Sequence, residues 1–85
     1  MKIELDVPSY AENGSLVAEW DSGFEIATSV DDGEVVIRAN AAGLRSLARH
    51  LLCLAGDEVP RGRHFHFDDL NSLEDGSAPV IIERT

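Results

Sequence analysis

The string His64-Phe65-His66-Phe67-Asp68 contains the residue types best suited to chemistry in this chain. In a β-strand alternate side chains share a face, so His64, His66 and Asp68 line up roughly 6–7 Å apart along one side. Imidazole and carboxylate groups can bind zinc or another divalent cation. A structural zinc site needs four ligands, however, and no second cluster with metal-ligand spacing accompanies the string. The pattern supports three interpretations: a solvated strand face, a contact surface for a partner, or a small metal site.

A second pair of reactive side chains is His50 and Cys53, with Arg49 four residues before the cysteine. A nearby cation can lower the pKa of a thiol, and a Cys–His pair can act as a nucleophile and its base. Both residues fall on the predicted polar side of one helix, and no third orienting residue accompanies them. We interpret them as part of a solvated helix face with an incidental thiol.

The elements that position these residues follow from hydrophobic periodicity. Alternation predicts four strands, followed by a helix and two more strands. The first four strands span residues 2–7, 16–20, 24–30 and 34–38, and the last two span 63–67 and 79–84. The turns carry Asn13-Gly14, Asp21-Ser22-Gly23 and Asp31-Asp32-Gly33, which favours an antiparallel meander. The prediction is a single α+β domain, residues 1–85, with a mostly antiparallel sheet of about six strands in the order ββββαββ.

The helix is predicted over residues 41–55, between an N-cap at Asn40 and a stop at Gly56. Its apolar stripe is expected to pack on one face of the sheet. The stripe consists of Leu44, Leu47, Ala48, Leu51, Leu52, Leu54 and Ala55. The residues expected to face solvent are Arg45, Ser46, Arg49, His50 and Cys53.

Composition excludes several classes of function. The 85 residues carry 16 acidic and 7 basic side chains, a net charge of −9, which disfavours nucleic acid or an anionic membrane as a partner. The single cysteine excludes an internal disulfide. No apolar run approaches the roughly 18 residues of a membrane span, so the expected location is the cytoplasm. No phosphate-binding loop or nucleophile-elbow motif is present, and no cofactor is predicted.

The acidic charge is concentrated in the predicted strands, whereas the helix is basic. Residues 1–38 have a net charge of −7, residues 39–56 of +2, and residues 57–85 of −4. If the helix covers one face of the sheet, then Glu4, Asp6 and Glu25 lie on the other face with His64 and His66. Such a face is either an ordinary solvated surface or an acidic binding surface.

Two strings together resemble a known family. The helix string, residues 40–52, has the pattern Asn-x-x-Gly-Leu-x-x-Leu-Ala-x-x-Leu, and it is followed by His-x-His-x-Asp and by Ile81-Ile82-Glu83. In this order they are similar to immunity protein family 32 of bacterial polymorphic toxin systems. The resemblance covers about residues 35–85.

The resemblance implies a non-enzymatic inhibitor that binds and neutralises a cognate toxin. The charge of −9 suits a basic toxin, because complementary charge speeds association. Among the motif positions, we expect Asn40 to cap the helix and Gly43 to allow close packing, which leaves His64, His66 and Asp68 as contact residues. Glu4, Asp6 and Glu25 complete the predicted binding surface, and the protein is expected to be a monomer or a weak homodimer.

Two alternatives remain open from the sequence. One is a small metal-binding protein that uses His64, His66 and Asp68. The other is a structural or interaction subunit that pairs through an edge strand, either residues 79–84 or residues 2–7.

Overall fold

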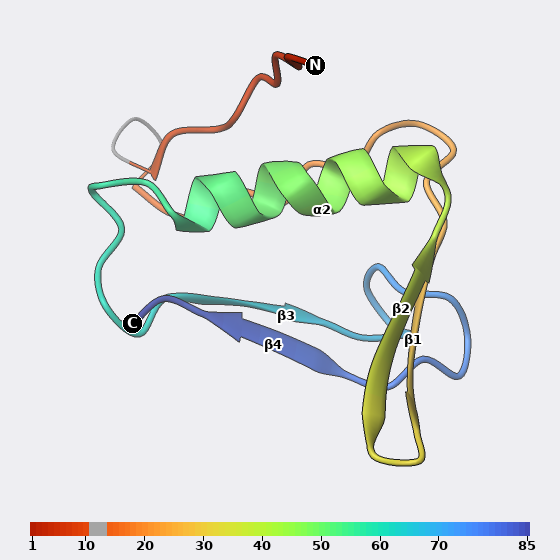
Figure 1. Cartoon of the computed structure of the whole chain (residues 1–85). Coiled ribbons are helices and arrows are strands. Elements are labelled where there is room, and N and C mark those ends of the chain that lie inside the picture. The colour runs from red at the N-terminus through yellow and green to blue at the C-terminus, as the bar shows by residue number, and fades with distance from the viewer. Residues whose placement is uncertain (11–13) are drawn as a thin grey trace.

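The computed structural model describes residues 1–10 and 14–85, and within them it has one long helix and two small sheets (Figure 1). The elements are β1 (Ile26–Asp31), β2 (Glu34–Ala39), α2 (Ala41–Leu54), β3 (His64–Phe67) and β4 (Val80–Glu83). The predicted α+β class is confirmed. The prediction of about six strands in one sheet is wrong, because β1 pairs only with β2 and β3 only with β4. Asn13, of the predicted Asn13-Gly14 turn, lies outside the described residues.

The β1–β2 hairpin is closed by a two-residue turn at Asp32 and Gly33. Both residues have positive φ, 50° and 79°, as a type I′ turn requires. This turn matches the right-handed twist of the strands, and the register runs from Ile26 opposite Ala39 to Asp31 opposite Glu34. Only the base of the hairpin reaches the core. Val30, near the tip, is therefore exposed.

The β3–β4 hairpin lies beneath α2 (Figure 1). Its strands pair antiparallel, with Phe65 opposite Ile82 and Phe67 opposite Val80. These four side chains turn toward the core, and both phenylalanines are buried. The strand predictions at 63–67 and 79–84 are confirmed within one or two residues at each end.

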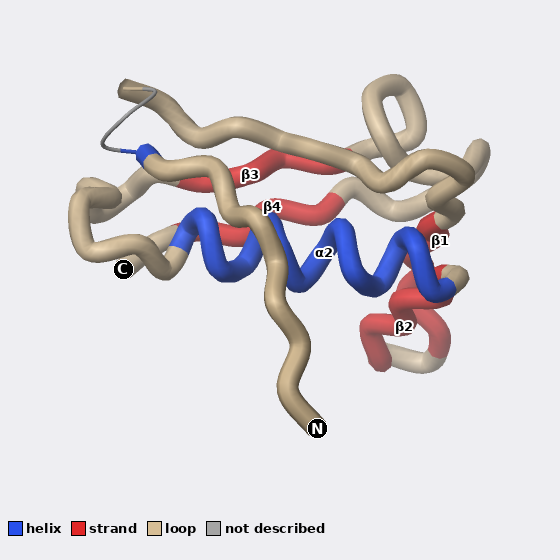
Figure 2. The backbone as a smooth tube through the Cα atoms, turned by 90° about the horizontal axis from the view of Figure 1, so that it is seen from above, coloured by secondary structure: helices blue, strands red, loops and turns tan. Residues whose placement is uncertain are grey.

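Two predicted strands are not strands. Residues 15–24, here called the crossing segment, run along α2 and β3 (Figure 2) but join no sheet. Residues 1–9, here called the arm, cross the outer side of α2, where Arg49 donates from Nε to the Asp6 carbonyl at 3.1 Å. Ile3 and Val7 of the arm are both exposed, and within the described residues no strand pairs with the arm.

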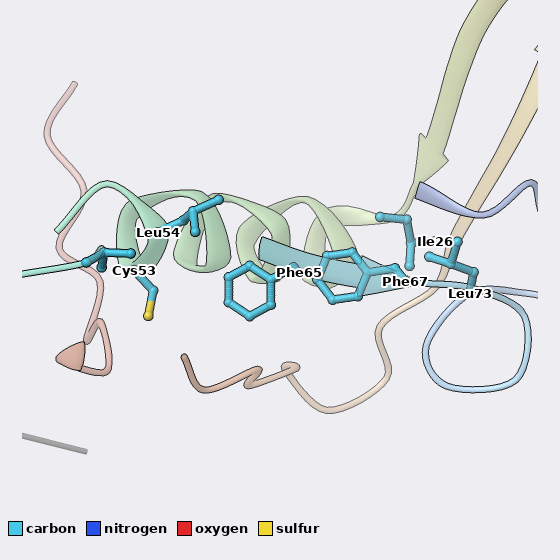
Figure 3. Close-up of a cluster of buried hydrophobic side chains, with 7 residues drawn as sticks. Ile26, Cys53, Leu54, Phe65, Phe67 and Leu73 are labelled. Atoms are coloured by element: carbon cyan, nitrogen blue, oxygen red, sulfur yellow. The ribbon is translucent and has the colours of Figure 1, made fainter. Parts of the chain in front are cut away.

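The core lies between α2, β3 and the crossing segment (Figure 3). Trp20 of the crossing segment stacks on Phe24 at 4.5 Å between ring centroids and meets His50 edge-on at 4.4 Å. The buried apolar residues are Ile26, Cys53, Leu54, Val59, Phe65, Phe67 and Leu73.

The helix presents a different face to the core from the one predicted. Its buried residues are Gly43, Ser46, His50, Cys53 and Leu54. Four members of the predicted inward stripe, Leu44, Leu51, Leu52 and Ala55, are exposed instead, whereas Leu54 is buried as predicted. One cause is a close approach at Gly43, where a Cβ atom would lie 2.3 Å from the Glu25 carbonyl oxygen. The expected close-packing role of Gly43 is therefore confirmed, and the contact fixes the side of α2 that can approach the Glu25 backbone.

Candidate functional site

The outer face of the β3–β4 hairpin brings together the two strand histidines. His64 and His66 are exposed, while the alternate residues Phe65 and Phe67 are 6% and 4% exposed. Burial of the two phenyl rings against α2 therefore orients both imidazoles outward, as alternation predicted. In the register His64 lies opposite Glu83 and His66 opposite Ile81. The face thus joins two imidazoles, a carboxylate and an exposed isoleucine.

Asp68 follows β3 and stabilises the turn that leaves the strand. Its Oδ1 accepts a hydrogen bond from the Leu70 N–H at 2.9 Å, and its carbonyl accepts one from the Leu73 N–H at 2.9 Å. Its Oδ2 lies 3.7 Å from His66 Nε2. Asp68 is therefore close to His66, but one of its carboxylate oxygens is already used in the turn.

The metal-site alternative has no geometric support. Among residues 1–10 and 14–85, no group of three or more His, Cys, Asp or Glu side chains is placed to hold a metal ion. His64 Nδ1 lies 3.3 Å from the Gly62 carbonyl, whereas His66 Nε2 approaches Asp68. The two rings therefore have separate nearest partners rather than a common centre.

The predicted acidic residues lie in different places. Glu4 and Asp6 belong to the arm, across α2 from the β3–β4 hairpin (Figures 1 and 2). Glu25 lies beside the N-terminal end of α2. Its N–H donates to Asn40 Oδ1 at 3.0 Å, and its carbonyl accepts from the Asn40 N–H at 3.1 Å. The structure brings His64 together with His66 and Asp68, but not with the three acids.

Asn40 does more than cap α2. Its Oδ1 accepts from the Gly43 N–H at 2.8 Å, the N-cap bond that the sequence predicted. Its Nδ2 also donates to the Gly23 carbonyl at 2.9 Å. Since Oδ1 also accepts from the Glu25 N–H, one side chain joins the helix start to the crossing segment and to the residue that precedes β1.

His50 was predicted to face solvent and is fully buried. Its Nε2 accepts a hydrogen bond from the Glu19 N–H at 3.0 Å, so in this arrangement that nitrogen carries no proton. Nδ1 has no hydrogen-bond partner among the residues that the structure describes. Burial lowers the pKa of His50, and the positive charge of Arg49 lowers the pKa further. His50 is therefore a neutral structural group. Cys53, three residues later, is also buried, so the two residues do not form a catalytic pair.

Asp21 forms ion pairs with both arginines of α2. Arg49 Nη1 lies 2.8 Å and Arg45 Nε 3.5 Å from its carboxylate oxygens. The Asp21 N–H also donates to Ser46 Oγ at 2.8 Å. The helix was predicted to be the one basic element, but its two arginines are paired with an acid of the crossing segment.

The sequence comparison assigns the chain to a family. A family model described as Immunity protein 32 matches residues 34–85, more than half of the chain. The chain belongs to this family. Neither the comparison with curated proteins nor the comparison with solved structures gives a match.

The matched region of this Immunity protein 32 member includes β2, α2 and both strands of the β3–β4 hairpin. It therefore contains Asn40, Gly43, His64, His66 and Asp68, whereas the arm and β1 precede it. Membership supports a toxin-neutralising binding role in general terms. No helix in the described residues is long and apolar enough to cross a membrane.

Proposed function

We propose that this protein neutralises one cognate toxin by forming a stoichiometric, non-catalytic complex with it in the cytoplasm. The observation that carries the proposal is the Immunity protein 32 match over residues 34–85. The binding surface proposed here, the outer face of the β3–β4 hairpin, lies within that region.

The composition of this face supports a protein contact. Ile81 is 63% exposed and lies opposite His66, with Glu83 and His64 beside them. An apolar side chain surrounded by polar groups that can donate and accept hydrogen bonds is typical of the centre and rim of a protein interface. We assign the direct contacts to His64, His66 and Asp68, and we add Ile81 as the apolar centre.

The three separated acids have a different role in the proposal. Glu4, Asp6 and Glu25 contribute to the net charge of −9 without sharing the hairpin face. A field of one sign raises the association rate with a basic partner, whereas contacts determine how slowly the complex dissociates. Replacing all three acids with lysine should therefore slow association and reduce its salt dependence, with a smaller effect on dissociation.

Neutralisation can be tested directly by co-expression. Candidate toxin domains from the source organism are expressed alone and together with this protein, and growth is recorded. Rescue by one toxin, followed by a 1:1 complex in native mass spectrometry, is the expected result. If no toxic domain is neutralised, or if a rescued toxin forms no complex, the proposed function is wrong.

The surface is tested with a pair of variants. His64→Ala/His66→Ala should weaken toxin binding by about tenfold or more, equivalent to roughly 1.4 kcal/mol. Leu44→Ser, on the exposed side of α2, is the matched control and should bind like the wild type. Equal affinity of the double variant and the control would move the binding surface away from the β3–β4 hairpin.

A further inference from the structure

The outer edge of β2 is unpaired, in contrast to the outer edge of β1. On β1, the Ile26 carbonyl accepts from the Glu74 N–H at 2.9 Å and the Thr28 carbonyl accepts from the Ala78 N–H at 3.0 Å. The backbone groups of Ile26 and Thr28 therefore face away from β2. By antiparallel alternation the outward groups on β2 belong to Val35, Ile37 and Ala39. In the described residues no chain segment binds them.

This edge is also apolar. Val35 is 70% exposed and Ile37 44%, and Val30 beside Val35 is 61% exposed. The hairpin projects past the β3–β4 hairpin, so its edge is accessible (Figure 1). Proteins protect exposed edges with proline, bulges, lysine and other charged side chains. The β2 sequence Glu-Val-Val-Ile-Arg-Ala has no proline, bulge or lysine, and its two charges, Glu34 and Arg38, are opposite in sign.

We propose that a second copy of this chain pairs with β2, edge to edge and antiparallel, so that two hairpins form one four-stranded sheet. The interface is isologous, since a two-fold axis relates the same strand in both copies. The proposal concerns a different surface from the β3–β4 face and does not depend on toxin binding.

The sequence of β2 selects one register. Because the outward groups belong to Val35, Ile37 and Ala39, the two-fold axis can pass beside residue 35, 36, 37 or 38. The axis at 38 would place Glu34 opposite Ala42, which lies outside β2. With the axis at Val36, Val35 lies opposite Ile37 of the second copy, and Glu34 lies opposite Arg38 of the second copy. The axis at 37 places Glu34 opposite Asn40, and the axis at 35 moves Ile37 beyond the end of the opposing strand. Only the Val36 register keeps both the apolar pair and the charge pair within β2.

The charges of the isolated hairpin favour this partner. Asp31 and Glu34 lie directly opposite each other across β1 and β2, which is unfavourable for two like charges. Arg38 lies 3.8 Å from Asp31, and both side chains are more than half exposed. In the Val36 register, Arg38 of the second copy lies on the other side of Glu34. Pairing therefore gives each Glu34 a cation that the isolated hairpin does not place opposite it.

The expected dimer is weak. A six-residue edge buries less than the roughly 1,200 Å² of a standard protein interface. We expect dimerisation to depend on concentration over a range of about 10 µM to 1 mM. Sedimentation equilibrium of the full chain should show the mass rising from 9.2 kDa toward twice that value.

A charge exchange tests the register. Glu34→Arg and Arg38→Glu should each weaken self-association by about fivefold or more, because each places like charges opposite one another. The double variant Glu34→Arg/Arg38→Glu should restore it. An equimolar mixture of the two single variants should form a heterodimer, seen in native mass spectrometry, because both charge pairs are then complementary.

Circular dichroism melting of every variant provides the folding control. A wild type that remains monomeric at about 1 mM overturns the proposal. Single variants that dimerise as well as the wild type, or a mixture without heterodimer, overturn the register. If the chain stays monomeric and Ile37→Lys abolishes toxin neutralisation, the edge binds the toxin rather than a second copy.

Discussion

A polar face of α2 lies toward the core, whereas a leucine-rich face lies toward solvent. The face toward the core carries Gly43, Ser46 and His50, and the last two are fully buried. The face toward solvent carries Leu44 and Leu51, which are 53% and 44% exposed. Cys53 and Leu54 are also buried, near the C-terminal end of α2. We infer that the contacts of Ser46 and His50, rather than leucine burial, determine which side of the helix faces the core.

The cause lies in the crossing segment. Because it joins no sheet, its backbone N–H groups need partners from elsewhere. Ser46 Oγ accepts from the Asp21 N–H and His50 Nε2 from the Glu19 N–H. Both hydrogen bonds are partly buried, and leaving a fully buried group without a partner costs about 1–3 kcal/mol, similar to the gain from burying a leucine. The comparison predicts that substitutions on the polar face are costly and that those on the leucine face are not.

The largest effect is expected at Gly43. Helix propensity alone predicts that Gly43→Ala stabilises the protein by about 1 kcal/mol. The new methyl group would instead lie 2.3 Å from the Glu25 carbonyl oxygen, and 3.1 Å from Ala39 Cβ, so the backbone must move. We expect a net loss of about 2–3 kcal/mol in the free energy of unfolding, measured by urea denaturation. Because helix propensity and the clash predict changes of opposite sign, a more stable variant would show that α2 does not approach the Glu25 backbone this closely.

The next largest effect is expected at His50. His50→Phe keeps an aromatic ring beside Trp20 and Phe67 but removes the acceptor for the Glu19 N–H. The predicted loss is about 1–3 kcal/mol, although the new side chain is more apolar. Amide hydrogen exchange at Glu19 should accelerate in the variant. An unchanged stability, with Glu19 still protected, would mean that the hydrogen bond does not orient the helix.

Lowering the pH should weaken the hydrogen bond between the Glu19 N–H and His50 Nε2. The pKa of His50 is lowered by burial in the folded state, whereas in the unfolded chain the pKa stays near 6.5. Below about pH 6.5 the unfolded state therefore binds more protons, and stability falls as the pH decreases toward the folded pKa. Urea denaturation at about pH 7.5 and 5.5 should show this loss in the wild type.

His50→Phe serves as the control for this pH dependence, since it removes the titrating group. The difference in stability between the wild type and the variant should therefore shrink on acidification. A constant difference across this pH range would show that His50 does not titrate between the two states.

Local signals predicted much of the fold. The Asn40 cap, the helix limits, the Asp32-Gly33 turn and the outward histidines all follow from a few neighbouring residues, and each is confirmed. Alternation in residues 2–7 and 16–20 also predicted strands, but alternation shows only that two faces differ. It does not show whether another strand is available to pair with the segment.

The candidate site was predictable to the same degree. His64, His66 and Asp68 are grouped because one strand and its following turn hold all three. Glu4, Asp6 and Glu25 were placed beside them only by assuming a single sheet. The role of His50 had one usable signal: it lies seven residues after Gly43 and four after Ser46, on the face that the glycine identifies as the close contact.

The smallest effect is expected on the leucine face. Leu51→Gln removes an apolar side chain from a position that is already 44% exposed, and glutamine has nearly the same helix propensity. The free energy of unfolding should therefore change by no more than about 0.5 kcal/mol. If Leu51→Gln costs as much as His50→Phe, measured side by side in urea, then leucine packing contributes as much as the polar contacts. Small loss at Leu51 and large loss at His50 would instead show that the crossing segment determines which side of the helix is buried.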